Sequence, residues 1–410
     1  MAGAGYKLFQ TGDVLTAAQV NTYLNEQTVM VFASAAARTS ALTSVLAEGM
    51  VSYLQDTNAV EVYNGSAWVA VSGASGVNKN YLINGGFAVA QRGTSFTASN
   101  NNDDSYTLDR WYILSDTNDV IDVTQDTTTV PTNGQFAIAL DVETVNKKFG
   151  IATIIENKDV IGLVGNTVTF SFKAKVSATT KLDNVKAAIV AWSGTADTVT
   201  SDIVSAWNVE GTNPTLIANA TYENSPVNLN LTTSYATYSI SAAVDTASAK
   251  NIILFIWSDV TDTTLGDFLY IAESKLELGS TATAFVYAGG TVEGELAACQ
   301  RYYIRYKSED GSTNNPTFNL GQMVSTTTFR FVLPFPTAMR VKPSAVEYSG
   351  FRLNSGATQY TSGAITIDQA NTLNTQLNVA ITSGPAAGTA AWLIPGSGSS
   401  TDYLGLSAEL

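Results

Sequence analysis

The chain of 410 residues contains no histidine and only one cysteine, Cys299. The absence of histidine excludes catalytic triads that use histidine and metal sites with imidazole ligands. A single cysteine cannot form an intrachain disulfide, and the apolar neighbours of Cys299 favour a buried, unreactive thiol. We therefore expect no cofactor, no metal site and no catalytic residues of these kinds.

Charged side chains are also scarce. They make up 14% of the residues, and the formal net charge is −14. Threonine, serine and asparagine take their place, which is typical of β-strands whose exposed faces carry hydroxyl and amide groups. The negative charge repels phosphate, so the sequence predicts no nucleic-acid partner. The charge is concentrated in residues 1–290, because residues 291–410 carry seven basic and eight acidic side chains.

Long apolar segments are missing. Even the strongly apolar run Ile252–Trp257 is far shorter than the about 20 residues of a membrane-spanning helix. We therefore expect no membrane insertion. The N-terminus has no basic region followed by an apolar run, so no secretory signal is expected. These features fit a protein that folds in the cytoplasm, including one assembled into a virion before the host cell lyses.

The 35 acidic residues leave one kind of catalysis open. Glycoside hydrolysis needs only a pair of carboxyl groups, but no spacing in the chain indicates such a pair, and we expect no enzyme. The loop with Asp103, Asp104 and Asp109 could hold a calcium ion. It lacks an ordered spacing of ligands, which favours a solvated loop, and the sequence leaves the question of calcium open.

Residues 1–72 are predicted to form a small mixed α+β module. Thr16 and Gln19 have the spacing of a helix capping box, and Ala35–Leu42 suits a second helix. Residues 50–71 alternate as a three-stranded meander, with Asn64-Gly65 as one of its turns. A unit of this size is marginally stable alone, so partner chains are expected to stabilise it. The glycine- and serine-rich residues 73–79 are interpreted as a linker.

Residues 80–290 are rich in strand patterns and have no convincing long helix, which favours an antiparallel β-sandwich. The clearest strands are Ala137–Val142, Thr167–Lys175, Val185–Trp192, Ala236–Ile240, Ile252–Trp257 and Phe268–Leu278. Because Ile252–Trp257 is apolar on both faces, it is predicted to be a central strand. Residues 291–410 repeat the pattern after a short helix at Glu293–Cys299, and a second, smaller sandwich is expected there. The predicted fold is all-β and multi-domain.

Five motifs carry a resemblance to a known family. They are Asn80–Phe87, Gln91-Arg92-Gly93, Leu108–Tyr112, Lys275–Gly279 and Thr281–Phe285. Residues 80–290, which these motifs open and close, resemble the jelly-roll domain of carbohydrate-binding modules as it occurs in bacteriophage tail and appendage fibres. Glu295–Tyr303 resembles the entry to the distal domain of such fibres. The hairpin with Val62-Tyr63-Asn64-Gly65 and Trp68 resembles the N-terminal module of many phage structural proteins.

This resemblance implies a tail-fibre or neck-appendage protein that attaches a virion to a glycan on the host surface. It further implies a homotrimer, contact with other virion proteins through residues 1–72, and a host surface polysaccharide as the second partner. Attachment would be non-covalent and multivalent. The main alternative is a purely structural decoration or connector protein of the head, neck or tail. A secreted bacterial carbohydrate-binding protein and an enzyme remain as further alternatives.

Four residues are candidates for ligand binding. Trp207 lies in a polar loop sequence and could present its ring to a sugar, although tryptophan is usually buried. Arg301, Tyr303 and Arg305 share one face of a predicted strand. That face could contact a glycan, pack at a subunit interface, or be plain surface, and we favour the interface because Arg and Tyr are enriched there. Trp111, Trp192 and Trp257 are expected to be core residues.

Overall fold

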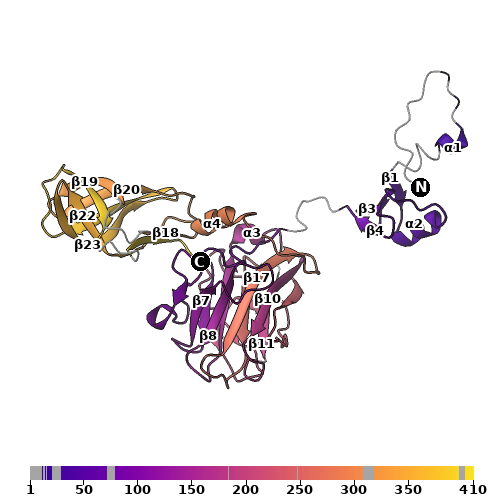
Figure 1. The fold of residues 1–410 in the computed structure, drawn as a ribbon, viewed down its shortest axis with the longest axis horizontal. Coiled ribbons are helices and arrows are strands. Elements are labelled where there is room, and N and C mark those ends of the chain that lie inside the picture. Colours follow the sequence, from indigo (N-terminus) through magenta and orange to yellow (C-terminus); the bar gives the residue numbers. More distant parts are fainter. Residues whose placement is uncertain are drawn as a thin grey trace. The chain divides into compact units, whose positions relative to one another are not determined.

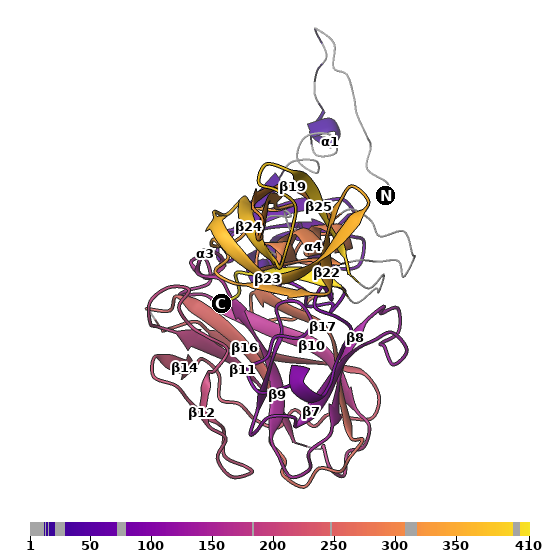
Figure 2. The same cartoon turned by 90° about the vertical axis from the view of Figure 1, so that its left-hand side faces the viewer.

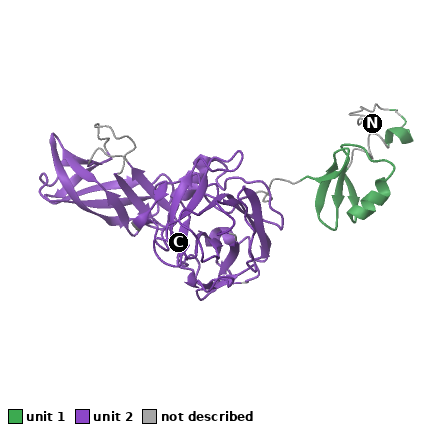
Figure 3. Ribbon diagram, turned by 60° about the horizontal axis from the view of Figure 1, so that its bottom comes forward, with its two compact units in different colours: residues 1–77 green, residues 78–410 purple. Residues whose placement is uncertain are grey.

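The computed structural model describes residues 12, 14, 16–20, 29–71, 79–182, 184–246, 248–307, 318–396 and 402–410. The chain divides into two compact units, Met1–Val77 and Asn78–Leu410, which Figure 3 shows in different colours. Of the predicted linker 73–79, all but Lys79 lies outside the described residues.

The first unit is a four-stranded sheet with two short helices. Its elements are α1 (Ala17–Val20), β1 (Val29–Phe32), α2 (Ala35–Leu42), β2 (Val51–Leu54), β3 (Ala59–Tyr63) and β4 (Trp68–Ala70). The predicted capping box is confirmed, since the Gln19 amide donates to Thr16 Oγ1 at 3.2 Å and the Thr16 amide donates to Gln19 Oε1 at 3.1 Å. The predicted meander is present as β2–β3–β4. The sequence did not predict β1, which adds to it by pairing in parallel with β2.

The second unit begins with a sandwich of two antiparallel sheets, here called the jelly roll (Figure 1). One sheet has six strands in the order β15-β10-β17-β8-β7-β5, and the other has five in the order β14-β11-β16-β9-β6. The strands of the six-stranded sheet are β5 (Ser95–Phe96), β7 (Ile121–Asp126), β8 (Ala137–Val142), β10 (Thr167–Val176), β15 (Ala236–Ala243) and β17 (Phe268–Leu278). The strands of the five-stranded sheet are β6 (Tyr112–Ser115), β9 (Phe149–Ile155), β11 (Val185–Trp192), β14 (Ala220–Tyr222) and β16 (Asn251–Ser258). A 3₁₀-helix η2 (Ala98–Asn100), a short helix α3 (Asn157–Val160) and a hairpin of β12 (Val204–Ala206) and β13 (Thr215–Leu216) complete it.

Both faces of the five-stranded sheet are covered, which explains its apolar sequence. The main core lies between the two sheets and includes Ile252, Leu254 and Ile256 of β16. The alternate residues Ile253 and Phe255 belong to a second core on the other face of the same sheet. The strand β16 lies between β11 and β9, so the predicted central strand is confirmed.

The rest of the second unit, here called the C-terminal part, begins with α4 (Val292–Gln300). A three-stranded sheet follows in the order β18-β26-β21, built from β18 (Tyr303–Lys307), β21 (Val346–Ser349) and β26 (Tyr403–Ser407). The remaining six strands form a closed barrel: β19 (Asn319–Ser325), β20 (Thr328–Pro334), β22 (Phe351–Ser355), β23 (Thr358–Ala370), β24 (Asn374–Ile381) and β25 (Ala390–Pro395). Figure 2 shows β22–β25 grouped apart from the jelly-roll strands.

The expected second sandwich therefore differs from the structure, because its main sheet closes on itself. Closure requires β25 to pair with both β19 and β22, a long-range pairing that alternation along single strands does not encode. The register of β23 against β24 shifts twice, and such bulges bend and twist a strand as closure demands. The broader prediction of an all-β, multi-domain chain is confirmed. Among the described residues, no helix has the length and apolar character needed to cross a membrane.

Candidate functional site

The motif residues Gln91 and Asp109 attach the C-terminal part to the jelly roll. The backbone amide of Gln91 donates to Asp109 Oδ2 at 2.6 Å, and its side-chain Nε2 donates to Asp109 Oδ1 at 2.5 Å. The same Nε2 also donates to the backbone oxygen of Tyr303 at 2.7 Å. Burial raises the pKa of Asp109, and the opposing effects of Arg92 and the Gln91 hydrogen bonds do not cancel this shift. Two motifs of the resemblance therefore hold strand β18 in place.

Two arginines of these motifs share one acidic partner near the end of the chain. Arg92 Nη1 lies 3.3 Å from Glu409 Oε1, and Arg110 forms an ion pair with the other oxygen of Glu409. The guanidinium of Arg110 lies 3.7 Å from the ring centre of Tyr302, and that of Arg92 lies 3.6 Å from the ring centre of Tyr303. Burial is the largest single influence and lowers the pKa of Arg92, but Glu409, Asp109 and smaller contributions together raise it by more, so the net shift is upward. Both arginines therefore remain charged in this junction.

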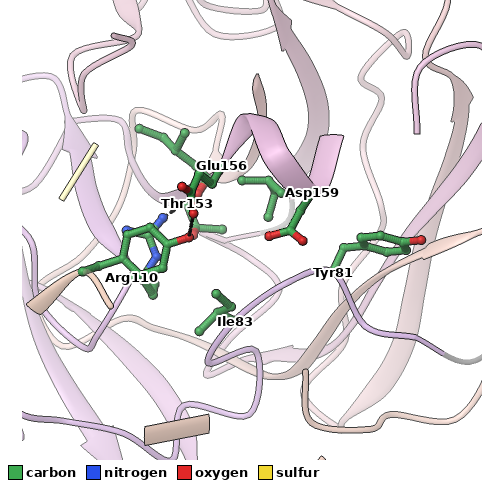
Figure 4. A pocket seen from close by; sticks show the side chains of 9 residues that line it. Tyr81, Ile83, Arg110, Thr153, Glu156 and Asp159 are labelled. Atoms are coloured by element: carbon green, nitrogen blue, oxygen red, sulfur yellow. Dashed lines mark hydrogen bonds between the residues drawn. The ribbon is translucent and has the colours of Figure 1, made fainter. Parts of the chain in front are cut away.

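Arg301 is bound to the jelly roll by a bidentate ion pair. Its Nε donates to Glu156 Oε2 at 2.9 Å and its Nη2 donates to Glu156 Oε1 at 2.7 Å. A cavity beside this pair, shown in Figure 4, has a volume of about 10 Å³ and is lined by Arg110, Glu156 and Tyr302 among others. A space of that size holds one water molecule at most, so this cavity cannot admit a sugar. The engaged guanidinium of Arg301 serves the contact between the two parts.

Tyr303 is fully buried, and its hydroxyl donates to Glu347 Oε2 at 2.9 Å. The guanidinium of Arg305 lies 3.5 Å from the ring centre of Tyr403 and donates to the backbone oxygen of Arg92. The predicted face of Arg301, Tyr303 and Arg305 thus meets the jelly roll of the same chain. A contact between two parts of one chain was not among the three interpretations of this face.

Trp207 lies in a different place, on the covered face of the five-stranded sheet. It is half-buried, and its ring packs against that of Phe255 in a T-shaped arrangement with a centroid distance of 5.9 Å. The buried Lys148 Nζ donates to the backbone oxygen of Val209 at 3.1 Å and holds this loop. Lys148 in turn pairs with Asp259 Oδ1 at 2.5 Å. The structure therefore does not bring Trp207 together with the other three candidates.

A cleft of about 480 Å³ opens where the jelly roll meets the C-terminal part. We call it the junction cleft. It is lined by residues that include Arg92, Ser95, Tyr106, Arg305, Glu347 and Tyr403. Its volume lies within the range of about 300–1,000 Å³ that is typical of small-ligand sites. Of the four predicted residues, Arg305 alone is among the described residues that line it.

The junction cleft combines aromatic, hydroxyl and charged groups. Tyr106 and Tyr403 are half-buried, so each leaves part of its ring accessible. The hydroxyl of Tyr106 donates to the backbone oxygen of Leu410 at 2.9 Å, which fixes the ring. Guanidinium and hydroxyl groups can donate hydrogen bonds, and the exposed Glu347 carboxylate can accept them. These groups have the chemistry to make hydrogen bonds and apolar contacts with a polyhydroxylated ligand.

Sequence reasoning missed Tyr106, Glu347 and Tyr403 in this cleft. They lie on a loop, on β21 and on β26, and only pairing between distant strands brings them together. A signal was present for Arg92, which belongs to one of the motifs quoted for the resemblance. A single arginine before a glycine does not by itself indicate a binding site, so this signal pointed to the family resemblance and not to a cleft.

In the acidic loop, the side chains of Asp103 and Asp109 face different partners. Asp103 Oδ1 accepts a hydrogen bond from the Ser115 amide at 2.7 Å, while Asp109 is turned toward Gln91. Burial, followed by repulsion from Asp103 and Asp202, raises the pKa of Asp104 to about 7. Among the described residues, no three Asp, Glu or Cys side chains gather closely enough to hold a metal ion.

Comparisons with known proteins give likenesses of fold only. No family model matches the chain, and a search of curated proteins gave no match. Among solved structures, the enzymatically active domain of bacteriophage CBA120 tailspike protein 4 is 15% identical, with a TM-score of 0.28 over 45% of this chain and 21% of that one. A putative sugar-binding protein from Bacteroides thetaiotaomicron is 15% identical, with a TM-score of 0.32 over 49% of this chain and 100% of that one.

A third structure is TmCBM61 in complex with β-1,4-galactotriose. It is 14% identical, with a TM-score of 0.26 over 49% of this chain and 100% of that one. The chain therefore spans about a fifth of the tailspike structure and the whole of the other two. At these identities and scores the likenesses carry no argument about a ligand, so any function must be argued from the site itself.

Proposed function

We propose that this protein is a non-catalytic adhesin of a bacteriophage virion that binds a host surface glycan in the junction cleft. The observation that carries the proposal is the cleft itself, in which two accessible tyrosine rings, two guanidinium groups and one carboxylate surround about 480 Å³. Tyrosine rings offer apolar faces to the C–H groups of a sugar, while the charged groups make directional hydrogen bonds with its hydroxyl groups.

The cleft is suited to binding and not to hydrolysis. Glu347 is the one acidic residue among the described residues that line it. Hydrolysis of a glycosidic bond in most enzymes requires two carboxyl groups on opposite sides of the bond, about 5–9.5 Å apart. The second carboxylate nearby, Glu409, is engaged by Arg92 and Arg110 and belongs to the ion pairs that join the two parts.

Attachment by this protein is multivalent under the proposal. A homotrimer presents three junction clefts, and weak sites that bind together gain avidity without new contacts. Residues 1–72 bind other virion proteins, and the C-terminal part, which forms one side of the cleft, faces the host. Light scattering is expected to give three times the 43.3 kDa of one chain. A mass of 43.3 kDa would indicate a monomer and contradict the multivalent part of the proposal.

Binding to a glycan array tests the proposal with the full-length protein. Tyr403→Ala removes one ring and the support of the Arg305 guanidinium, and binding to any glycan that the wild type selects is expected to fall at least about tenfold. Arg305→Ala is expected to act in the same direction. Arg352→Ala is the matched control, because Arg352 is an exposed arginine on β22 that is not among the residues of the cleft.

Adsorption assays separate the adhesin from a structural decoration protein. Particles that carry Tyr403→Ala should incorporate the protein normally and adsorb poorly. Normal adsorption would contradict the adhesin role and leave a structural one. A point variant is a sharper tool than removal of residues 291–410, because that truncation deletes Glu409 and leaves Arg110 buried without its ionic partner.

A further inference from the structure

A second pocket, of about 300 Å³, is lined by jelly-roll residues and by Val292 of α4, and it shares no described lining residue with the junction cleft. We call it the β17 pocket. Its walls include Gly86, Asn133, Gln135, Glu273, Phe285 and Tyr287. Gly86 and Phe285 belong to the motifs that open and close the resemblance to carbohydrate-binding modules. The junction does not use either of them.

The apolar wall of the β17 pocket is a pair of aromatic rings. Phe285 and Tyr287 are half-buried and meet edge to face at a centroid distance of 5.2 Å. They lie directly against the backbone at Gly86, where an added Cβ atom would stand 2.7 Å from Tyr287 Cε1 and 3.0 Å from Phe285 Cζ. Any side chain at position 86 would therefore displace the rings. The glycine is what allows this wall to form.

The pocket also has polar lining residues, two of which, Asn133 and Glu273, have positive φ angles. Glu273 has a φ of 48° within β17, beside the bulge that shifts the register of β17 against β10. Bulges turn side chains out of the regular alternation, and here the carboxylate meets Lys173 Nζ at 2.8 Å. Asn133, with a φ of 65°, and Gln135 present exposed amide groups, and within the described part of the chain their side chains make no hydrogen bond.

We propose that the β17 pocket binds one neutral pyranose of a glycan, as a second site beyond the one proposed above. Two half-buried aromatic rings offer apolar surface to a sugar, and two free amides together with Glu273 offer donors and acceptors for its hydroxyl groups. Because Lys173 balances the charge of Glu273, the site has no excess charge to attract a uronate or a phosphate. A pocket of this volume is at the lower end of the usual range for small ligands, which fits a single sugar ring.

Saturation-transfer NMR on the full-length protein tests this inference. The probes are the methyl α- and β-pyranosides of glucose, galactose and mannose, together with methyl glucuronoside. At least one neutral glycoside is expected to bind with a millimolar dissociation constant, and more tightly than the glucuronoside. Tyr287→Ala and Gln135→Ala should each weaken that binding, the former by about tenfold. Tyr270→Ala is the matched control, because Tyr270 is a half-buried tyrosine on β17, the strand of Glu273, and is not among the described residues that line the pocket.

Three results would overturn the inference. The first is no saturation transfer from any neutral glycoside. The second is binding that survives both pocket variants or that falls equally with Tyr270→Ala. The third is a change of oligomeric state in Tyr287→Ala, which would identify the pocket as a contact between copies of the chain. Because Tyr403→Ala tests the junction cleft separately, failure of one site is distinguishable from failure of the other.

Discussion

Arg301 and Glu156 form a bidentate ion pair with N–O distances of 2.9 and 2.7 Å. Glu156 directly precedes α3 of the jelly roll, and Arg301 directly follows α4 of the C-terminal part. Tyr302 donates a further hydrogen bond to Glu156 Oε2 at 2.8 Å. Charge-assisted, forked hydrogen bonds of this kind are among the strongest and most directional in proteins. The pair therefore holds the two sides of the junction cleft in one arrangement.

Glu156→Gln is expected to destabilise the second unit at neutral pH by about 1.5–3 kcal/mol, the usual contribution of hydrogen bonds to a charged group. Burial raises the pKa of Glu156, but the hydrogen bonds from Arg301 and Tyr302, together with the positive charges of Arg301 and Lys158, outweigh it and hold the pKa below 4.5. A depressed carboxyl pKa adds stability above the unfolded value, and that stability is lost as the pH falls through the folded value. The melting-temperature difference between wild type and variant should therefore shrink below pH 4.5.

Glu143→Gln is the control for this measurement, since Glu143 is exposed and its side chain makes no hydrogen bond in the described part of the chain. Glu143→Gln should change the melting temperature little, both at neutral pH and below pH 4.5. Equal effects of the two variants, or a Glu156→Gln difference that grows at low pH, would contradict the role of the ion pair.

The stability of Asp104→Asn relative to the wild type is expected to increase as the pH rises. The pKa of Asp104 is 3.8 in its usual state and about 7 in the fold, where burial comes first among the causes and Asp103 second. A raised carboxyl pKa means that the folded protein binds a proton which the unfolded chain has lost, so stability falls between these two values. Asparagine tolerates the φ of 64° at this position. In thermal melts, the melting temperature of Asp104→Asn minus that of the wild type should be larger at pH 8 than at pH 4.

Asp259→Asn is expected to cost about 3–5 kcal/mol, because it leaves buried ammonium groups without a counter-charge. Asp259 pairs with Lys148 at 2.5 Å and with Lys186 at 2.7 Å, and all three are buried. Asp262→Asn is the matched control, since its pair with Lys181 is largely exposed and such pairs contribute about 0–1 kcal/mol. Chemical denaturation compares the two. Proteolysis should also become faster in the loop that carries Trp207, because Lys148 holds it.

Gly150→Ala is expected to destabilise the jelly roll by at least about 1–3 kcal/mol, the usual cost of overpacking. An added Cβ atom at Gly150 would stand 2.3 Å from the backbone oxygen of Ile256 and 2.8 Å from Trp257 Cα, so two strands of the five-stranded sheet would have to separate. At Gly162 an added Cβ atom meets nothing within 4 Å, so Gly162→Ala should change stability little. A melting temperature of Gly150→Ala equal to that of this control would show that the sheet adapts.

The sequence by itself determined the individual elements. Alternation and turn residues located strands such as Ala137–Val142 and Phe268–Leu278 at their observed bounds, since one strand's pattern depends only on which of its faces is buried. The capping box at Thr16 was equally local. The double-sided burial of Ile252–Trp257 was also visible, because an apolar run without alternation has no solvent-facing side.

The tertiary structure alone decided how these elements pair and pack against one another. Whether the C-terminal strands form an open sandwich or a closed barrel depends on the pairing of β25 with both β19 and β22, which no single strand encodes. The junction cleft joins Tyr106 to Tyr403, almost three hundred positions apart in the sequence, through packing between the two parts. Local sequence could not predict the ion pair of Arg301, because its partner, Glu156, is distant in sequence. Local patterns report which face is buried, whereas a binding site depends on which buried faces meet.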